Sequence, residues 1–210
     1  MLRVLIVDDH EVLRDGVKRV LDRRPGELIF GEAGTAAEAL RLAREREWDV
    51  VVLDLSLGSR SGLEVLKELR QLRPRLPVLI LSMHSEEQFA RRAFKAGASG
   101  YITKDSPRAE LAEAVRKVAG GGTYVSPALA EKLVFDLRRG DDRAPHELLS
   151  DREFEVLRLI GSGKTVGEIA DTLSLSDNTI STYRARILEK TGMKTNAELT
   201  HYAIQNKLVD

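Results

Sequence analysis

The chain has 210 residues, in which 33 Lys and Arg balance 33 Asp and Glu, and it contains no cysteine. This length fits one or two domains, because domains most often have about 100–150 residues. The lack of cysteine excludes disulfides and thiolate zinc sites, and the balanced charge means that any nucleic-acid surface must be a local patch. No apolar run approaches the roughly 20 residues that span a bilayer, so we expect a cytoplasmic protein with no membrane partner.

The first half alternates short apolar runs with segments of helical period. Alternation of this kind predicts right-handed βαβ units and a parallel sheet with helices on both faces. Five repeats within residues 1–122 indicate a flavodoxin-like, doubly wound α/β domain with a five-stranded parallel sheet. The five predicted strands are Leu2–Val7, Leu28–Glu32, Val50–Leu53, Val78–Leu81 and Gly100–Ile102.

Acidic residues follow two of these strands. Asp8 and Asp9 come directly after the first strand, and Asp54 comes directly after the third. Ligands gather at the carboxyl ends of parallel strands, so we expect the three carboxylates to meet there. Close carboxylates repel one another and favour a cation between them, and oxygen ligands suit Mg²⁺ or Ca²⁺.

Two further polar residues follow the last two predicted strands. Ser82 follows Val78–Leu81, and Lys104 follows Gly100–Thr103. At one edge of a sheet these groups suit phosphoryl transfer to a carboxylate. Asp54 attacks phosphorus, while Lys104 and the metal neutralise charge on the phosphoryl oxygens and Ser82 donates a hydrogen bond to one of them.

These strand ends resemble the receiver domain of two-component response regulators. The motifs that carry the resemblance are Val7–His10, Asp49–Leu55, Leu81–Ser82 and Ile102–Lys104. The resemblance covers the whole first half of the chain.

The resemblance implies a role for each matched position. Asp9, Asp54 and the backbone carbonyl of Ser56 would hold Mg²⁺, with Asp8 acting through water. Ser82 and Lys104 would contact the phosphoryl group, and Tyr101 would be an aromatic switch.

One position in the loop after Asp54, Ser56–Gly62, departs from the family pattern. Gly58 stands where the family usually has proline. Proline restricts φ and glycine frees it, so the stiffness of the loop and the placing of the Ser56 carbonyl are open. His84 lies where a side chain could screen an attacking water, and His10 is interpreted as an exposed first-turn residue of the following helix.

Residues 123–147 are predicted to link two domains. Gly120–Gly122 ends the last helix of the first domain, and Ser126–Pro127 opens a short helical pattern that reaches residue 138. The charged stretch Arg138–Pro145 lacks large apolar residues and predicts a flexible linker.

Residues 148–210 carry four helix starts in close succession. The pattern Ser/Thr-x-x-Glu predicts capping boxes at Ser150–Glu153, Thr165–Glu168 and Thr195–Glu198, and Ser176 caps a further helix. Each start precedes apolar residues at helical spacing. We therefore expect a second, all-α domain of four helices.

The second and third of these helices form a predicted helix-turn-helix. Only Ser174–Ser176 joins them, and the third helix, Asp177–Thr191, has an apolar face and a face of small polar and basic residues. Such a face suits the DNA major groove. The candidate DNA-binding residues are Thr165, Asn178, Thr179, Ser181, Thr182, Arg184, Arg186 and Lys190.

This second domain resembles the NarL/LuxR-type DNA-binding domain. The motifs are Leu149–Glu153, Glu168–Ala170, Asn178–Ser181 and Ile187–Gly192. The resemblance implies a tetrahelical helix-turn-helix that dimerises through the last helix, Thr195–Gln205, with Thr195, Leu199 and Tyr202 as candidate dimer contacts. A helical protein-interaction bundle with a solvated basic face is the alternative.

Together the two halves predict a transcriptional response regulator. A histidine kinase phosphorylates Asp54, and the homodimer then binds half-sites in double-stranded DNA; self-phosphorylation and slow self-hydrolysis are the only chemistry expected. One alternative is a regulator switched by a protein or small ligand instead of phosphate. The other is an aspartyl-phosphate phosphatase, which needs a second acid two residues after the nucleophile and meets Ser56 there.

Overall fold

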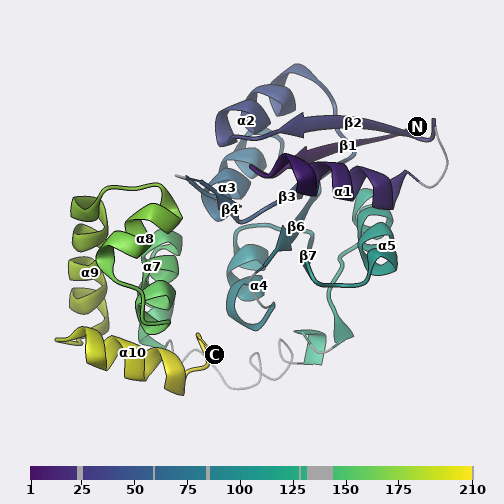
Figure 1. The fold of residues 1–210 in the computed structure, drawn as a ribbon. Coiled ribbons are helices and arrows are strands. Elements are labelled where there is room, and N and C mark those ends of the chain that lie inside the picture. Colours follow the sequence, from purple (N-terminus) through teal and green to yellow (C-terminus); the bar gives the residue numbers. More distant parts are fainter. Residues whose placement is uncertain (23–25, 59, 84–85, 128, 132–143, 210) are drawn as a thin grey trace. The chain divides into compact units, whose positions relative to one another are not determined.

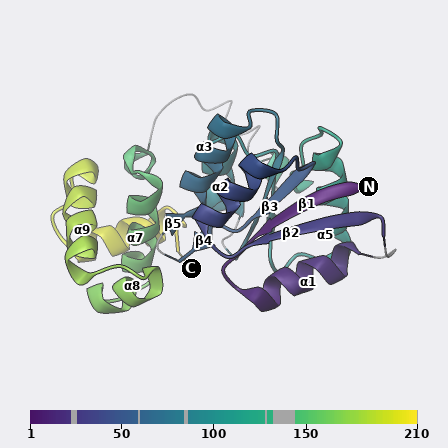
Figure 2. The ribbon, with the colours of Figure 1, turned by 90° about the horizontal axis from the view of Figure 1, so that it is seen from above.

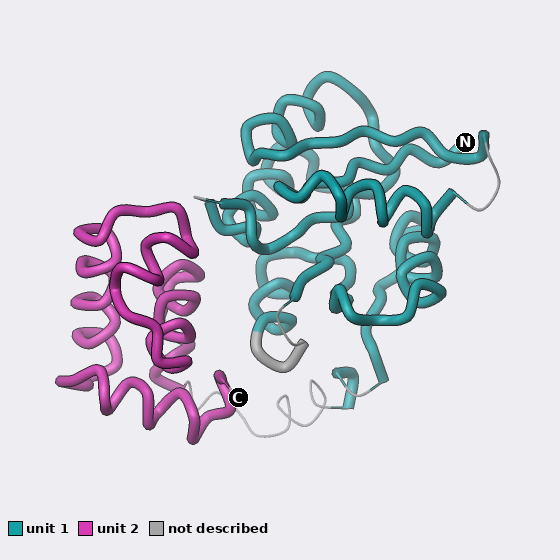
Figure 3. Tube along the Cα trace, in the orientation of Figure 1, with its two compact units in different colours: residues 1–138 teal, residues 139–210 magenta. Residues whose placement is uncertain are grey.

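The computed structural model describes residues 1–22, 26–58, 60–83, 86–127, 129–131 and 144–209. The chain divides into two compact units, residues 1–138 and residues 139–210 (Figure 3). No helix in the described ranges is both long enough and apolar enough to cross a membrane.

Unit 1 is built on a five-stranded parallel sheet in the order β2-β1-β3-β6-β7 (Figure 1). The central strands β3 and β6 are buried along their whole length, as expected for apolar runs covered on both faces. The predicted doubly wound α/β fold is therefore confirmed. The strands are β1 (Leu2–Val7), β2 (Leu28–Ala33), β3 (Val50–Leu53), β6 (Val78–Ser82) and β7 (Gly100–Thr103).

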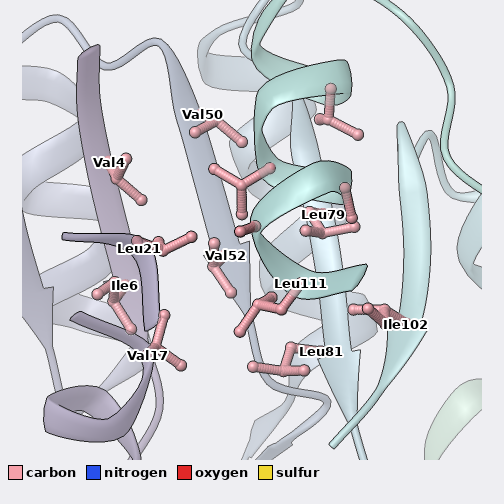
Figure 4. Close-up of a cluster of buried hydrophobic side chains, with 14 residues drawn as sticks. Val4, Ile6, Val17, Leu21, Val50, Val52, Leu79, Leu81, Ile102 and Leu111 are labelled. Carbon is pink, nitrogen blue, oxygen red and sulfur yellow. The ribbon is translucent and has the colours of Figure 1, made fainter. Parts of the chain in front are cut away.

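Helices cover both faces of this sheet. Figure 2 shows α1 and α5 on one side and α2 and α3 on the other, while α4 packs beside β7. Beneath α1 and α5, side chains such as Val17 and Leu111 meet Ile6 and Val52 from the strands in one buried cluster (Figure 4). The helices are α1 (Glu11–Leu21), α2 (Ala36–Glu45), α3 (Gly62–Leu72), α4 (Glu86–Lys95) and α5 (Arg108–Ala119).

The segment after Asp54 is a short hairpin and not the plain loop that the sequence predicted. β4 (Ser56–Leu57) pairs with β5 (Arg60–Ser61) in antiparallel register. Gly58 lies between them with φ +54°, in the left-handed region that glycine enters without strain. Proline could not adopt this angle, so the hairpin explains why glycine stands here.

The chain beyond α5 adds a contact to the sheet edge that the sequence did not indicate. The helix ends before Gly120, as predicted, and Tyr124 then forms a parallel bridge with Gly100 of β7. The Tyr101 amide donates to the Tyr124 carbonyl at 3.2 Å. The Ser126 hydroxyl caps the start of the next turn by accepting from the Leu129 amide.

Parts of three predictions lie outside the described residues. They are the later part of the short helix predicted to reach residue 138, most of the charged linker Arg138–Pro145, and His84.

Unit 2 is all-helical, as predicted. A 3-10 turn, η1 (Pro145–Leu148), precedes α7 (Asp151–Gly161), α8 (Val166–Leu173), α9 (Asp177–Thr191) and α10 (Asn196–Gln205). The capping boxes at the starts of α7 and α8 are complete. At α10 the Thr195 hydroxyl accepts from the Glu198 amide, but the Glu198 carboxylate accepts from the Lys194 amide, so the predicted third box is shifted by one residue.

Candidate functional site

Three carboxylates meet at the carboxyl edge of the sheet in unit 1. Strands β1 and β3 are neighbours, with Val7 opposite Leu53, so Asp8 and Asp54 emerge side by side. Both are buried, whereas Asp9 is exposed. One donor atom from each of Asp8, Asp9, His10 and Asp54 lies within 4.8 Å of the others.

Lys104 bridges the two buried carboxylates. Its Nζ lies 2.7 Å from Asp8 Oδ2 and 2.7 Å from Asp54 Oδ2, and its side chain is only 7% exposed. Burial would lower the pKa of Lys104, but the charges and hydrogen bonds of Asp54 and Asp8 outweigh it and raise that pKa above its usual value. The ammonium group therefore stays charged and neutralises part of the acidic edge.

The buried environment of Asp54 changes its pKa. Burial raises the pKa of Asp54 to about 6, against the opposing effects of Lys104 and of a hydrogen bond from the Ser56 amide. Its Oδ1 atom is buried and has no hydrogen-bond partner in the described part of the chain. The carboxylate thus has one oxygen held by Lys104 and one left open.

The other predicted site residues of unit 1 lie on the same strands or directly after them. Ser82 is the buried last residue of β6, the strand next to Asp54, and its carbonyl accepts from the Lys104 amide. Tyr101 is fully buried in β7. Ser56 begins β4.

Sequence reasoning left out one residue of this cluster. His10 was interpreted as an exposed first-turn residue, and its side chain is indeed 64% exposed, but its Nδ1 lies 2.7 Å from Asp9 Oδ1. The only sequence signal was its place directly after two acids.

The helix-turn-helix of unit 2 separates an apolar face from a polar one. Ile180 and Ile187 of α9 are buried, and the candidate residues Asn178, Ser181 and Thr182 are exposed. Ser174 at the end of α8 adopts φ +52°, which turns the chain sharply into the next helix.

The remaining candidate DNA contacts differ in how they are held. Thr165 caps α8, and Thr179 pairs with the cap of α9, Ser176. Arg186 is exposed. Arg184 donates to Asn196 Oδ1 at 2.5 Å, and Lys190 lies 2.6 Å from Glu153 Oε2.

Comparison with known proteins identifies both units. Residues 4–116 match the family described as response regulator receiver domain, and residues 147–203 match bacterial regulatory proteins of the luxR family. The response regulator GacA of Pseudomonas protegens is 37% identical over 210 residues, covering 100% of this chain and 99% of the relative. UvrY of Escherichia coli is 32% identical over 209 residues, covering 99% and 96%.

The chain is a two-component response regulator. As predicted from its motifs, it joins a receiver domain to a luxR-family domain, and it is a DNA-binding regulator of transcription and not a dedicated enzyme.

Solved structures agree with this family. A LuxR-family response regulator from Aurantimonas sp. SI85-9A1 is 41% identical, with TM-score 0.59 over 64% of this chain and 96% of its own. RcsB of Salmonella typhimurium, at 23% identity and TM-score 0.66 over 96% of both chains, shares the fold. Structures of RcsB have been solved with DNA.

The acidic edge of the receiver domain fits a divalent cation. Its donors are carboxylate oxygens, which are the ligands of hard cations. The unpartnered Asp54 Oδ1 leaves a buried acceptor open at the cluster, and one lysine leaves the three acids with a net negative charge.

In the luxR-family domain, the three candidate dimer contacts at the last helix differ in exposure. Leu199 is fully buried inside the unit. Thr195 is exposed at the start of α10. Tyr202 is half-buried, with its hydroxyl 2.8 Å from His146 Nδ1.

Proposed function

We propose that Asp54 is the phosphoryl acceptor of this regulator and that a histidine kinase supplies the phosphoryl group. The observation that carries the proposal is the state of the Asp54 carboxylate. It is buried beside a charged lysine, and its Oδ1 has no partner among the described residues. An acceptor that is held by one oxygen and open at the other is oriented for in-line attack.

The chemistry is a displacement at phosphorus. An Asp54 oxygen forms the new P–O bond while the bond from phosphorus to the donor nitrogen or oxygen breaks, and that atom keeps the electron pair and takes a proton. Lys104, which spans Asp8 and Asp54, neutralises charge on the phosphoryl oxygens, and the Ser82 hydroxyl donates to one of them.

We assign the cation at this edge as Mg²⁺, held by Asp9, Asp54 and the Ser56 carbonyl, with Asp8 acting through water. When bound, the ion would supply positive charge that offsets the charge of the phosphoryl oxygens. Asp8 and Asp9 add negative charge at this edge. Lys104 alone does not balance that charge, so the site favours a cation.

The output of the switch is DNA binding by unit 2. Phosphorylation biases a two-state receiver in which Ser82, Lys104 and Tyr101 repack. The small exposed residues of α9 approach base edges, and the basic residues and Thr165 contact phosphates. Two chains pair through the exposed surface of α10 and bind two half-sites.

The domain bounds and cell compartment complete the proposal. We assign residues 1–122 to the receiver, 123–147 to the linker and 148–210 to the DNA-binding domain, in a cytoplasmic protein. The spans of the two family matches, 4–116 and 147–203, are compatible with these bounds.

Intact-mass measurement tests the acceptor. Wild type incubated with a small-molecule phosphodonor and Mg²⁺ gains one phosphoryl adduct, and Asp54→Asn gains none. Asp105→Asn is the matched control, because Asp105 is exposed and directly follows Lys104; it keeps the adduct. An adduct on Asp54→Asn, or none on wild type, rules the proposal out.

The same measurement distinguishes this proposal from a second candidate function, a receiver switched by a protein or small ligand. A regulator of that kind would show no adduct but would still bind DNA. A hairpin with glycine at position 58 in place of the family's proline is the one observation that favours it.

A further inference from the structure

His10 is the residue of the acidic edge to which the proposed function gives no role. It stands at the start of α1, and its backbone N–H donates to Asp8 Oδ1 at 2.8 Å. Its ring Nδ1 lies 2.7 Å from Asp9 Oδ1 and 3.2 Å from Asp8 Oδ1. The imidazole is therefore placed over the two adjacent acids, although one side of it faces solvent.

The contact with Asp9 places the ring nitrogen where a cation would bind. A carboxylate oxygen only accepts, so Nδ1 holds the hydrogen in this contact. A metal ion between the same two atoms would replace that hydrogen and bond to both. The imidazole must then either leave the site or become a ligand, and its backbone hydrogen bond to Asp8 keeps it close.

The spacing of the donor atoms fits a small divalent ion. Metal–ligand bonds to nitrogen and oxygen are about 2.0–2.2 Å, so opposite ligands lie about 4.0–4.4 Å apart. The donor atoms of Asp9, His10 and Asp54 are within 4.8 Å of one another, so a contraction of less than about 1 Å brings them to the spacing of ligands on one ion.

A second observation points independently to a ligand. Asp54 is 3% exposed, and its buried Oδ1 has no partner in the described residues. Lys104 holds the Oδ2 atoms of both Asp8 and Asp54. The one lysine therefore leaves this cluster with an unsatisfied buried oxygen and an adjacent imidazole, which is the donor set of a site that takes a ligand.

We propose that His10 is a nitrogen ligand of the cation and makes this site selective. The inference rests on the proposed metal site at Asp54. Mg²⁺ is bound through oxygen and gains little from an imidazole, whereas affinity for nitrogen-containing sites rises from Mn²⁺ to Ni²⁺. The site therefore prefers Mn²⁺ and Ni²⁺ to Mg²⁺, and the preference comes from His10.

Pulsed EPR of the full chain loaded with Mn²⁺ tests the ligand directly. A coordinated imidazole adds ¹⁴N modulation to the electron spin echo of the ion. Wild type shows this modulation, and His10→Ala binds Mn²⁺ without it. His201→Ala is the matched control, because His201 is exposed on α10 in the other unit; it keeps the modulation. His84→Ala checks that the nitrogen does not come from elsewhere in unit 1.

Titration calorimetry measures the selectivity. We expect His10→Ala to weaken Ni²⁺ and Mn²⁺ binding by about tenfold or more, on the scale of losing a metal-site contact, and to change Mg²⁺ binding by less than about twofold. His10→Gln, which offers an oxygen in place of the nitrogen, lowers the Ni²⁺ affinity without abolishing Mg²⁺ binding.

The outcomes separate this inference from the proposed function. Mn²⁺ binding without ¹⁴N modulation in wild type overturns the role of His10 and leaves the phosphoacceptor intact. Equal losses for all three ions in His10→Ala also overturn it, since they mark a structural role. Failure of wild type to bind any of the ions overturns both this inference and the proposed metal site.

Discussion

At the scale of single residues, burial decides how the Asp54 carboxyl behaves. Its pKa is raised to about 6 by burial even though Lys104 opposes the shift. An acid with a raised pKa in the folded state contributes stability in full below its unfolded pKa, and that contribution is lost as pH rises through the folded pKa. The ionised Asp54 carboxylate therefore lowers the free energy of unfolding of the metal-free receiver above about pH 6.

Asp54→Asn tests this cost. The amide carries no charge at any pH, so the variant is more stable than wild type at pH 8, by about 3 kcal/mol for a shift of this size, and the difference shrinks toward pH 4. Urea unfolding in chelator at several pH values measures it. A difference that does not change between pH 4 and 8 contradicts the prediction. Added Mg²⁺ serves as a control, since it stabilises wild type selectively.

A glycine beside Asp54 sets how closely the chain can pass the site. A Cβ on Gly62, the first residue of α3, would lie 2.2 Å from the Asp54 carbonyl oxygen and 2.6 Å from Leu55 Cα. Gly62→Ala must shift this backbone, and we expect a loss of about 1–3 kcal/mol in unfolding free energy.

Gly16 is the matched control for this substitution. It lies inside α1 with nothing within 4 Å of its added Cβ, so Gly16→Ala gains about 0.5–1 kcal/mol from helix propensity. Chemical denaturation of both variants measures the pair. Equal effects of the two substitutions would show that the close approach at Gly62 has no energetic consequence.

At the scale of elements, the β4–β5 hairpin is the feature that most constrains the segment after the acceptor. It holds Ser56 opposite Ser61 in a fixed register, and Arg60 forms an ion pair with Glu68 of α3. The hairpin requires the left-handed conformation at Gly58. Pairing between β4 and β5 therefore fixes the backbone of this segment where proline would restrict only φ.

Gly58→Pro should break this arrangement. Proline restricts φ to about −65°, so the turn cannot form, Ser56 loses its register, and Mg²⁺ affinity falls by about tenfold, on the scale of a lost supporting contact. Gly58→Asn tests the cause, because asparagine tolerates the left-handed region and should lose much less. Titration with Mg²⁺ measures the affinity of both variants and of wild type. Equal affinity of the proline variant and wild type would refute the role of the hairpin.

The elements that the sequence predicted are those with a clear local pattern. A continuous apolar run such as Val50–Leu53 identifies a strand buried on both faces, because every residue of it must be apolar. The capping boxes at Ser150 and Thr165 mark helix starts through contacts between neighbouring residues. The two-residue strands of the hairpin carry no such pattern. The bridge between Tyr124 and Gly100 joins residues far apart in the sequence, so no local sequence pattern predicts it.

The site residues that directly follow a strand were predictable from the sequence. Asp8, Asp54 and Lys104 each follow an apolar run, and the parallel topology alone brings them to one edge. The Asp9–His10 contact depends on the rotamer of an exposed side chain and was not predictable. The burial of Leu199 was not predictable, because helical spacing alone does not tell which side of α10 packs on α7.

At the scale of the whole molecule, balanced charge confines DNA attraction to part of the surface. The 33 basic and 33 acidic residues cancel, so no long-range field of one sign draws the chain to DNA. Lys190 pairs with Glu153 and Arg184 with Asn196. Arg186, exposed on α9, is then the basic residue of the recognition helix most available to a phosphate.

This assignment predicts how salt affects DNA binding. Each phosphate contact releases counterions, so the slope of log affinity against log salt reports the number of contacts. Arg186→Ala should flatten the slope by about 1 per bound chain and weaken binding similarly on different sequences. Arg75→Ala, at an exposed position of the receiver, should leave the slope unchanged. If the two variants behave alike in a titration of the phosphorylated chain with promoter DNA, the attraction is spread over the molecule and Arg186 is not a phosphate contact.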